Sequence, residues 1–422
     1  MKSKFLIVSC LLYIAVLQCV SCNGKKETAK QNTKNSQTQT EKTEAEVEIP
    51  MKPLYELAAQ YGFKMGGAIG YEQIDNAKHK KMLTDDFNSV TFTNELKAYS
   101  LLDWGVRQKD GMPALNFTKA DKMMDFAQSA GLKVRGHVLV WDAYMTEWFF
   151  YEDYKEKKFA SKEVMLKRLK NYIEQVITHF ETKYPGVIYA WDVVNEAVGD
   201  GGDFKADDKC HIRTTRGGTK NLFYETIGRD YVKYAFKYAY DCVKKNGYDI
   251  TLFYNDYNTF QPGKRTAICN LIDELNAKDK INPDGSKLCQ GIGMQGYVGG
   301  YGTQNGCMNN MDITSIKDSI EIYAQKGMQV QITEMAVRNY QRDNYSLITH
   351  AEFYGKLANM IRDINSTCDG SFTCWAIWGL LDNPSLPESD YSYKMNGPYC
   401  GLFTWDYKKK DAYKKVNEAL AN

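Results

Sequence analysis

The chain has 422 residues, a formal net charge of +2 and a charged fraction of 25%. This near-neutral balance excludes the strongly basic class of nucleic-acid-binding proteins, so we expect no nucleic-acid partner. The sequence contains 30 tyrosines and 7 tryptophans, and such rings stack on sugar faces as well as filling protein cores, which favours a carbohydrate ligand.

Residues 1–21 have the pattern of a secretory signal peptide. Lys2 and Lys4 precede an apolar core that is too short for a comfortable transmembrane helix. The core runs into the sequence CVSC at 19–22, which resembles a bacterial lipoprotein cleavage site with Cys22 as the lipidated N-terminus. An ordinary signal peptide is the alternative. We expect an exported lipoprotein on the outer membrane or cell surface, with the periplasmic face also possible.

Residues 22–50 are expected to form a flexible linker after the lipidated cysteine. The stretch 23–49 is rich in Lys, Glu, Thr, Gln and Asn and has no aromatic residue. A segment of this composition cannot bury enough apolar surface to fold. We therefore expect a lipid anchor that tethers a single catalytic domain, residues 51–422, to a membrane, and we expect that domain to be a monomer.

Strands and helices alternate from residue 51 onward. Apolar runs predict strands at 63–70, 88–92, 133–140, 187–197, 250–254, 291–294, 329–335 and 371–377. Helical patterns lie between them, at a run ending at 81 and at 118–130, 161–182, 226–245, 261–278, 313–326, 344–364 and 409–420. Eight such units in roughly 370 residues predict an α/β fold of the (β/α)8 TIM-barrel class. An open doubly wound sheet is the alternative, weakened because no Gly-x-Gly-x-x-Gly turn follows the first strand.

Polar side chains collect where these strands end, and on a barrel the carboxyl ends of the strands meet at one face. Glu196 and Glu334 each end a buried apolar run, and a pair of carboxylates is what glycosidic bond cleavage requires. Taken alone, Glu196 could equally be a core carboxylate held by an arginine. The other polar or aromatic residues at strand ends are Asn94, Lys97, His137, Trp141, Asn195, Asn255, Asp256, Gln295 and Trp375.

A set of motifs in this order resembles glycoside hydrolase family ten, the retaining endo-β-1,4-xylanases. The motifs are TNELK at 93–97, RGHVLVW at 135–141, WDVVNEAV at 191–198, GIGMQG at 291–296, QITEM at 331–335 and FTCWAIWGLLDN at 372–383. The resemblance extends from about residue 53 to residue 420. It implies a TIM barrel that needs no cofactor and no metal.

The resemblance also implies roles for individual residues. Glu196 would be the general acid/base and Glu334 the nucleophile, with their carboxyl groups roughly 5 Å apart as retention requires. Asn195 would bind the 2-hydroxyl of the sugar at the cleavage point. Trp375 would be the stacking platform for that sugar, and Trp141 would close the pocket. The remaining side chains implied to frame the substrate are Asn94, Lys97, His137, Gln295 and Tyr297.

Several positions depart from the family's pattern. Thr93 stands where a carboxylate usually grips the next sugar, and Asp142 stands in place of a histidine. Tyr297 also replaces a histidine, yet its hydroxyl can still donate to Glu334. A second platform tryptophan is missing at 383–386. The Gly199–Asp203 loop lacks the ligand spacing of a calcium loop, so we expect it to be solvated.

The expected function is therefore retaining, endo-acting hydrolysis of β-1,4-xylosidic bonds in xylan or a related decorated plant polysaccharide. Two alternatives stay open because of the departures. One is a hydrolase of the same family that acts on another β-glycan. The other is a glycan-binding lipoprotein with weakened catalysis.

Overall fold

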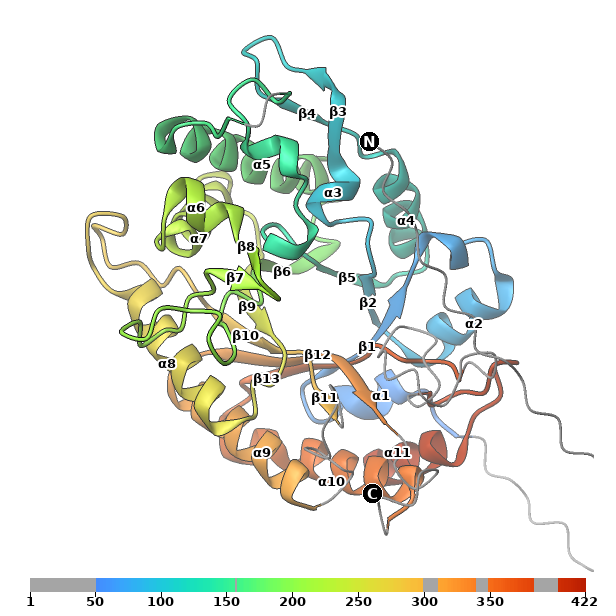
Figure 1. Cartoon of the computed structure of the whole chain (residues 1–422). Helices are drawn as coiled ribbons and strands as arrows, with labels where there is room; N and C mark the ends of the chain where they lie inside the picture. Colours follow the sequence, from blue (N-terminus) through green and yellow to red (C-terminus); the bar gives the residue numbers. More distant parts are fainter. Residues whose placement is uncertain (1–50, 156–157, 299–309, 339–347, 383–400) are drawn as a thin grey trace, which may run out of the picture. The chain divides into compact units, whose positions relative to one another are not determined.

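Parallel strands close into a ring at the centre of the fold (Figure 1). The structure is a computed structural model that describes residues 51–155, 158–298, 310–338, 348–382 and 401–422. Within these ranges the ring closes because β10 pairs with both β9 and β12, and β13 pairs with β1. Its strands are β1 (Lys64–Ile69), β2 (Ser89–Phe92), β5 (Lys133–Gly136), β6 (Ile188–Asn195), β9 (Thr251–Asp256), β10 (Gly291–Met294), β12 (Gln329–Val337) and β13 (Phe372–Ile377). The TIM-barrel prediction is confirmed.

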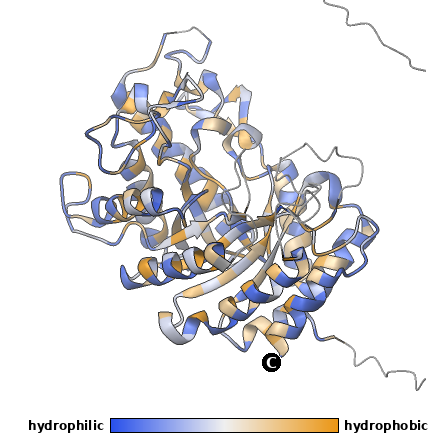
Figure 2. Ribbon diagram, turned by 60° about the horizontal axis from the view of Figure 1, so that its bottom comes forward, coloured by the Kyte–Doolittle hydropathy of each residue, from blue (hydrophilic) through white to orange (hydrophobic). Residues whose placement is uncertain are grey.

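Helices surround the ring (Figure 1). They are α1 (Leu54–Ala59), α2 (Ala77–Asp86), α3 (Ala98–Leu101), α4 (Thr118–Ser129), α5 (Lys162–Lys183), α6 (Leu222–Ile227), α7 (Tyr231–Asn246), α8 (Pro262–Asn276), α9 (Asn310–Gln325), α10 (His350–Cys368) and α11 (Asp411–Ala421). Figure 2 shows many of these helices with hydrophilic and hydrophobic residues on opposite sides, as expected for helices that cover a sheet.

Three local features differ from the prediction. The helix expected at 226–245 is two helices, α6 and α7, because Gly228 between them has a φ of 96°. The strand expected at 133–140 ends as β5 at Gly136, and Val140 rejoins the ring through a single bridge to Val194. Between the strand expected at 187–197 and the helix expected at 226–245, where no regular element was predicted, lies a small hairpin of β7 (Thr215–Arg216) and β8 (Thr219–Lys220).

Smaller elements decorate the connections between barrel strands. A second hairpin, β3 (Leu102–Arg107) and β4 (Pro113–Leu115), lies at the rim of the barrel after α3 (Figure 1). The 3-10 turns η1 (Tyr71–Gln73), η2 (Asp142–Tyr144) and η3 (Glu147–Phe150) follow β1 and β5. The short strand β11 (Tyr297–Val298) pairs with the end of β12.

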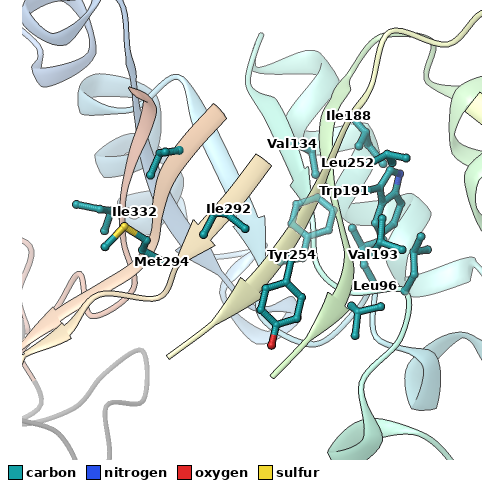
Figure 3. Close-up of a cluster of buried hydrophobic side chains, with 14 of the residues drawn as sticks. Leu96, Val134, Ile188, Trp191, Val193, Leu252, Tyr254, Ile292, Met294 and Ile332 are labelled. Atoms are coloured by element: carbon teal, nitrogen blue, oxygen red, sulfur yellow. The ribbon is translucent and has the colours of Figure 1, made fainter. Parts of the chain in front are cut away.

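Apolar side chains from the strands form the core. Figure 3 shows part of it, with Trp191 beside Ile188 and Leu252. Trp191 is fully buried, and its ring packs so closely over β5 that a Cβ on Gly136 would lie 2.3 Å from it. Burial of side chains of this size stabilises a fold by about 2–3 kcal/mol each. The core thus fixes the strand ends on which the polar residues stand.

The predicted signal peptide at 1–21, Cys22 and the linker at 22–50 lie outside the described residues and stay predictions. Residues 383–386, where the sequence lacks the second platform tryptophan, also lie outside the described residues. Among the helices of the described ranges, none combines the length and the apolar character that crossing a bilayer requires.

Candidate active site

Glu196 stands directly after β6, where the chain leaves the ring. Its φ is 53°, a left-handed conformation that costs a non-glycine residue about 1–3 kcal/mol and often marks a functional position. Neighbouring elements hold this backbone. The Glu196 amide donates to the Asn255 carbonyl at 2.9 Å, and its carbonyl accepts from Arg213 Nε at 3.1 Å. The side chain is therefore fixed at the carboxyl end of the barrel.

Glu334 lies on β12 and is as deeply buried as Glu196, with exposed fractions of 6% and 7%. Its Oε1 accepts from Asn255 Nδ2 at 3.0 Å, and its Oε2 accepts from the Tyr297 hydroxyl at 2.6 Å. The contact with Tyr297 is the one predicted for this residue in place of a histidine. Both donors are neutral groups, so they orient the carboxylate and stabilise its charge without cancelling it.

Side-chain amides connect the two carboxylates. Gln295 Nε2 donates to Glu196 Oε1 at 2.9 Å and lies 3.3 Å from Asn195 Oδ1. Asn255 Nδ2 donates to the same Asn195 oxygen at 3.0 Å and to Glu334. The two glutamates predicted to be catalytic therefore lie in one hydrogen-bonded cluster. Asn255, noted as a strand-end residue, proves to be a direct partner of Glu334.

Two features of this cluster leave a donor free on Asn195. Asn195 Oδ1 accepts from the side-chain amides of Asn255 and Gln295, so Asn195 Nδ2 points away from these two residues. In the part of the chain that the structure describes, this Nδ2 is buried without a hydrogen-bond partner. Gly293 makes room for the arrangement, because a Cβ there would lie 2.2 Å from Asn255 Oδ1. An unpaired buried donor costs about 1–3 kcal/mol, so it is suited to a ligand hydroxyl.

Arg216, on the β7–β8 hairpin, is a site residue that the sequence prediction missed. Its Nη1 donates to Glu196 Oε2 at 2.8 Å, and its Nη2 donates to Asp142 Oδ1 at 2.7 Å. An arginine that holds Glu196 is what the purely structural interpretation of this carboxylate predicts. In the structure Glu196 is held by this arginine and also belongs to the hydrogen-bonded cluster that contains Glu334, so the two interpretations do not exclude each other. The only signal in the sequence was the unusual Asp142, whose charge calls for a cation nearby.

Lys97, Asn94 and Trp141 form a second group of predicted site residues. Lys97 Nζ donates to Asn94 Oδ1 at 3.1 Å and lies 5.1 Å from the centre of the Trp141 ring. Tyr144, not predicted, adds a second ring 4.4 Å from the same ammonium. Burial lowers the pKa of Lys97, while the charges of Glu334 and Glu196 oppose that shift. The lysine is therefore electrostatically coupled to the carboxylate cluster.

His137 lies just after β5 and is 2% exposed. Its Nδ1 lies 2.9 Å from Asp192 Oδ2, and Arg135 pairs with the same carboxylate. Burial opposes the charge of Asp192, but Arg135 and His137 together hold its pKa below the usual range. This pairing fixes the orientation of the imidazole ring, as carboxylates do for functional histidines elsewhere.

Trp375 is not in the site, and its prediction as a sugar platform is wrong. The side chain is 0% exposed, and its ring stacks on Tyr354 of α10 at a centroid distance of 6.4 Å, between the sheet and the helix. Three residues on, Trp378 follows the end of β13, with its ring 6.3 Å from that of His137. Alternation along β13 sends position 375 to the helices, whereas Trp378 lies beside a predicted site residue.

The Gly199–Asp203 loop is held by cations and is not simply solvated as expected. Asp203 Oδ2 accepts from Arg213 Nη1 at 2.7 Å, and Asp200 lies 3.4 Å from both Arg213 and Lys264. Across the described ranges, no cluster of His, Cys, Asp and Glu side chains has the geometry of a metal site. The acidic loop therefore serves to fix the segment that carries Arg213 and Arg216.

The chain is similar in sequence to known proteins. The family model described as glycosyl hydrolase family 10 matches residues 53–419. Endo-1,4-beta-xylanase B of Butyrivibrio fibrisolvens is 33% identical over 371 residues, which is 85% of this chain and 52% of that protein. Endo-1,4-beta-xylanase A of Thermotoga maritima is 33% identical over 395 residues, 88% of this chain and 32% of that protein. The chain thus spans about half or less of the length of these relatives.

A solved structure agrees with the fold. The endo-1,4-beta-xylanase from Caldicellulosiruptor owensensis superposes with a TM-score of 0.66 at 26% identity, covering 87% of this chain and 99% of that one. The similarity therefore includes the complete barrel of that protein.

Proposed function

This chain belongs to glycosyl hydrolase family 10, and on that premise we propose that it is a retaining endo-β-1,4-xylanase. Its substrate is xylan or a related decorated plant polysaccharide. The hydrogen-bonded cluster of Glu196, Asn195 and Glu334 supports this reaction. Relatives of similar sequence are named endo-1,4-beta-xylanases, which supports the substrate class.

The single observation that carries the proposal is the amide donor of Asn195, which lies between two buried carboxylates and has no partner among the described residues. A polysaccharide presents a hydroxyl next to each anomeric carbon. A donor fixed beside both glutamates can bind that hydroxyl while they act on the adjoining bond, and such contacts to the 2-hydroxyl strengthen in the transition state. An amide suits this position because it adds no charge to a site that already holds two acids.

The reaction then follows in two displacements. A Glu334 oxygen attacks the anomeric carbon, the glycosidic C–O bond breaks, and Glu196 gives its proton to the departing oxygen. In the second step Glu196 takes a proton from water as the water oxygen attacks the same carbon and the ester bond to Glu334 breaks. Two inversions retain the configuration. Asn255 and Tyr297 keep the Glu334 carboxylate aimed throughout.

The deciding experiment incubates the whole protein with purified xylan and measures new reducing ends and product sizes over time. We expect reducing ends to appear together with a rapid fall in mean polymer length, because an endo-acting enzyme cuts bonds within the polysaccharide. Binding of xylan without new reducing ends would favour the glycan-binding alternative. A parallel panel of other purified β-glycans tests the altered-substrate alternative, which Thr93 favours because it offers no carboxylate to the neighbouring sugar.

Trp378 is proposed as the sugar platform in place of Trp375. Trp378→Ala should raise KM for xylan about fivefold, because a lost aromatic contact is worth about 1 kcal/mol. The matched control is Trp104→Ala, which removes an equal ring that is 60% exposed on the β3–β4 hairpin. Steady-state kinetics on xylan should show the KM change in the first variant only, and an equal change in both would exclude a specific platform.

Export and lipid anchoring at Cys22 are also part of the proposal, supported by the sequence CVSC at 19–22 and the polar linker after it. Cys22→Ser in the full chain should move the protein from the membrane fraction to the soluble fraction of the producing cell, because the acylated residue is gone. Cys19→Ser is the control and should leave the fraction unchanged. Membrane association that survives Cys22→Ser would contradict the anchor.

A further inference from the structure

The guanidinium of Arg216 bridges the two carboxylates of Glu196 and Asp142. In addition to the Nη contacts above, its Nε donates to Asp142 Oδ2 at 3.1 Å, which makes that pair bidentate. Counting side-chain atoms alone, Arg216 is 28% exposed, whereas Asp142 and Glu196 are 5% and 10% exposed, the latter against 7% for the whole Glu196 residue. Charge-assisted pairs of this kind are strong when solvent is largely excluded.

The hairpin that carries Arg216 is held firmly over Glu196. Gly217 and Gly218 form its turn with φ values of 55° and 82°, which glycine adopts without strain. At the base of the hairpin, Arg213 Nη1 donates to Asp203 at 2.7 Å and Arg213 Nη2 donates to the Val198 carbonyl at 3.0 Å. Arg216 therefore reaches Glu196 from a fixed support.

Arg216 is the cation in direct contact with the Glu196 carboxylate, among the residues that the structure describes. Burial opposes the charge of Arg216, but hydrogen bonds to Asp142 and the charge of Glu196 raise its pKa, so it stays a full cation. Other charged or titratable groups surround this pair. Lys97 and Asp256 interact with Glu196 through their charges, Arg213 donates to the Glu196 carbonyl, and Tyr257 interacts with Arg216. Asp256 pairs with Lys264, and Tyr297 donates to Glu334.

A general acid/base must lose and regain a proton in each cycle, and a cation at hydrogen-bond distance favours its ionised form. Asp142 disfavours the ionised form of Glu196, because it accepts hydrogen bonds from the same guanidinium and places a second negative charge nearby. We propose that Arg216 is a positioning residue that aims the Glu196 carboxylate and strengthens it as an acid, and that Asp142 moderates this effect. The inference rests on the proposed function of Glu196 and deepens it.

The test compares the pH dependence of kcat/KM on an aryl β-xylobioside for the wild type, Arg216→Met and Asp142→Asn. Loss of the cation lets Glu196 keep its proton to higher pH, so Arg216→Met should move the alkaline limb upward by roughly one to two pH units. Asp142→Asn removes a negative charge and leaves Arg216 to act on Glu196 alone, so its alkaline limb should move downward by a smaller amount. A purely structural role would not move the two limbs in opposite directions.

Two further variants control for charge and for the hairpin. Arg216→Lys keeps the cation and should hold the alkaline limb near the wild-type position. Lys220→Met removes a cation from the same hairpin, where Lys220 is 65% exposed and pairs with Glu225, and should leave the limb unchanged. Alkaline limbs that stay in place in both Arg216→Met and Asp142→Asn would overturn the inference, as would a shift in Lys220→Met equal to that in Arg216→Met.

A measurement without turnover separates this inference from the proposed function. The carboxyl carbon of Glu196 can be followed by NMR during a pH titration and assigned from its absence in Glu196→Gln. Its midpoint should rise in Arg216→Met and fall in Asp142→Asn, even in a protein that hydrolyses no xylan. Unchanged midpoints overturn the inference alone, whereas an inactive wild type with shifted midpoints overturns the proposed function alone.

Discussion

Glu334→Gln should lower kcat on xylan by roughly 10⁴-fold or more, since loss of a nucleophile leaves only binding and the remaining polar groups to assist the reaction. The amide keeps the volume of the carboxylate, and its oxygen can still accept from Asn255 or Tyr297. It cannot form the glycosyl ester that the second displacement consumes. The fold should be retained, and steady-state kinetics with a thermal unfolding curve measures both effects.

The matched control is Glu181→Gln on α5. Glu181 is 7% exposed and so about as buried as Glu334, but it accepts from the Gly186 amide at 3.3 Å on the outer layer of the barrel. This variant should keep wild-type kcat. Mass spectrometry with a 2-fluoro aryl xyloside adds a direct test, because the wild type should accumulate one covalent adduct on the peptide that contains Glu334. An adduct on another residue would refute the nucleophile assignment.

Most of the barrel could be predicted from the sequence because its strands have an unambiguous pattern. Strands buried on both faces form continuous apolar runs, as in the stretch around Trp191. The polar residues that end these runs are also positioned by the ring itself, so Glu196 and Glu334 could be placed at one face before their contacts were known. The helix break at Gly228 and the β7–β8 hairpin depend on local glycine conformations that the apolar pattern does not encode.

Side-chain direction limited the prediction of the site more than strand position did. Trp375 and Trp378 lie in one motif, and the sequence alone does not show that the first ring faces the helices on β13 while the second, just after β13, lies beside His137. Arg216 could not be predicted as a site residue for another reason. Its contact with Glu196 spans a loop of irregular structure, and such long-range pairs depend on tertiary packing and not on local propensity.

Glu196→Ala should produce an effect that depends on the leaving group, since only the general acid/base is lost. On xylan, whose leaving group is an alcohol that needs a proton, kcat/KM should fall by about 10²–10⁴-fold. An aryl xylobioside with an acidic phenol needs little protonation, so its first step should be nearly normal. The second step still needs a base to activate water, so the glycosyl-enzyme should accumulate, visible as a burst of phenol.

Azide then distinguishes this role from a structural one. The alanine removes the carboxylate that accepts from Gln295 and Arg216, so both donors then face an open space near the anomeric carbon. Azide is a nucleophile that needs no base, so it should restore turnover of the aryl xylobioside and yield a xylobiosyl azide. Two inversions, first at Glu334 and then by azide, require the β-anomer. An α-azide would show direct displacement without a Glu334 ester, and failure of azide to restore turnover would contradict the role of Glu196 as the base.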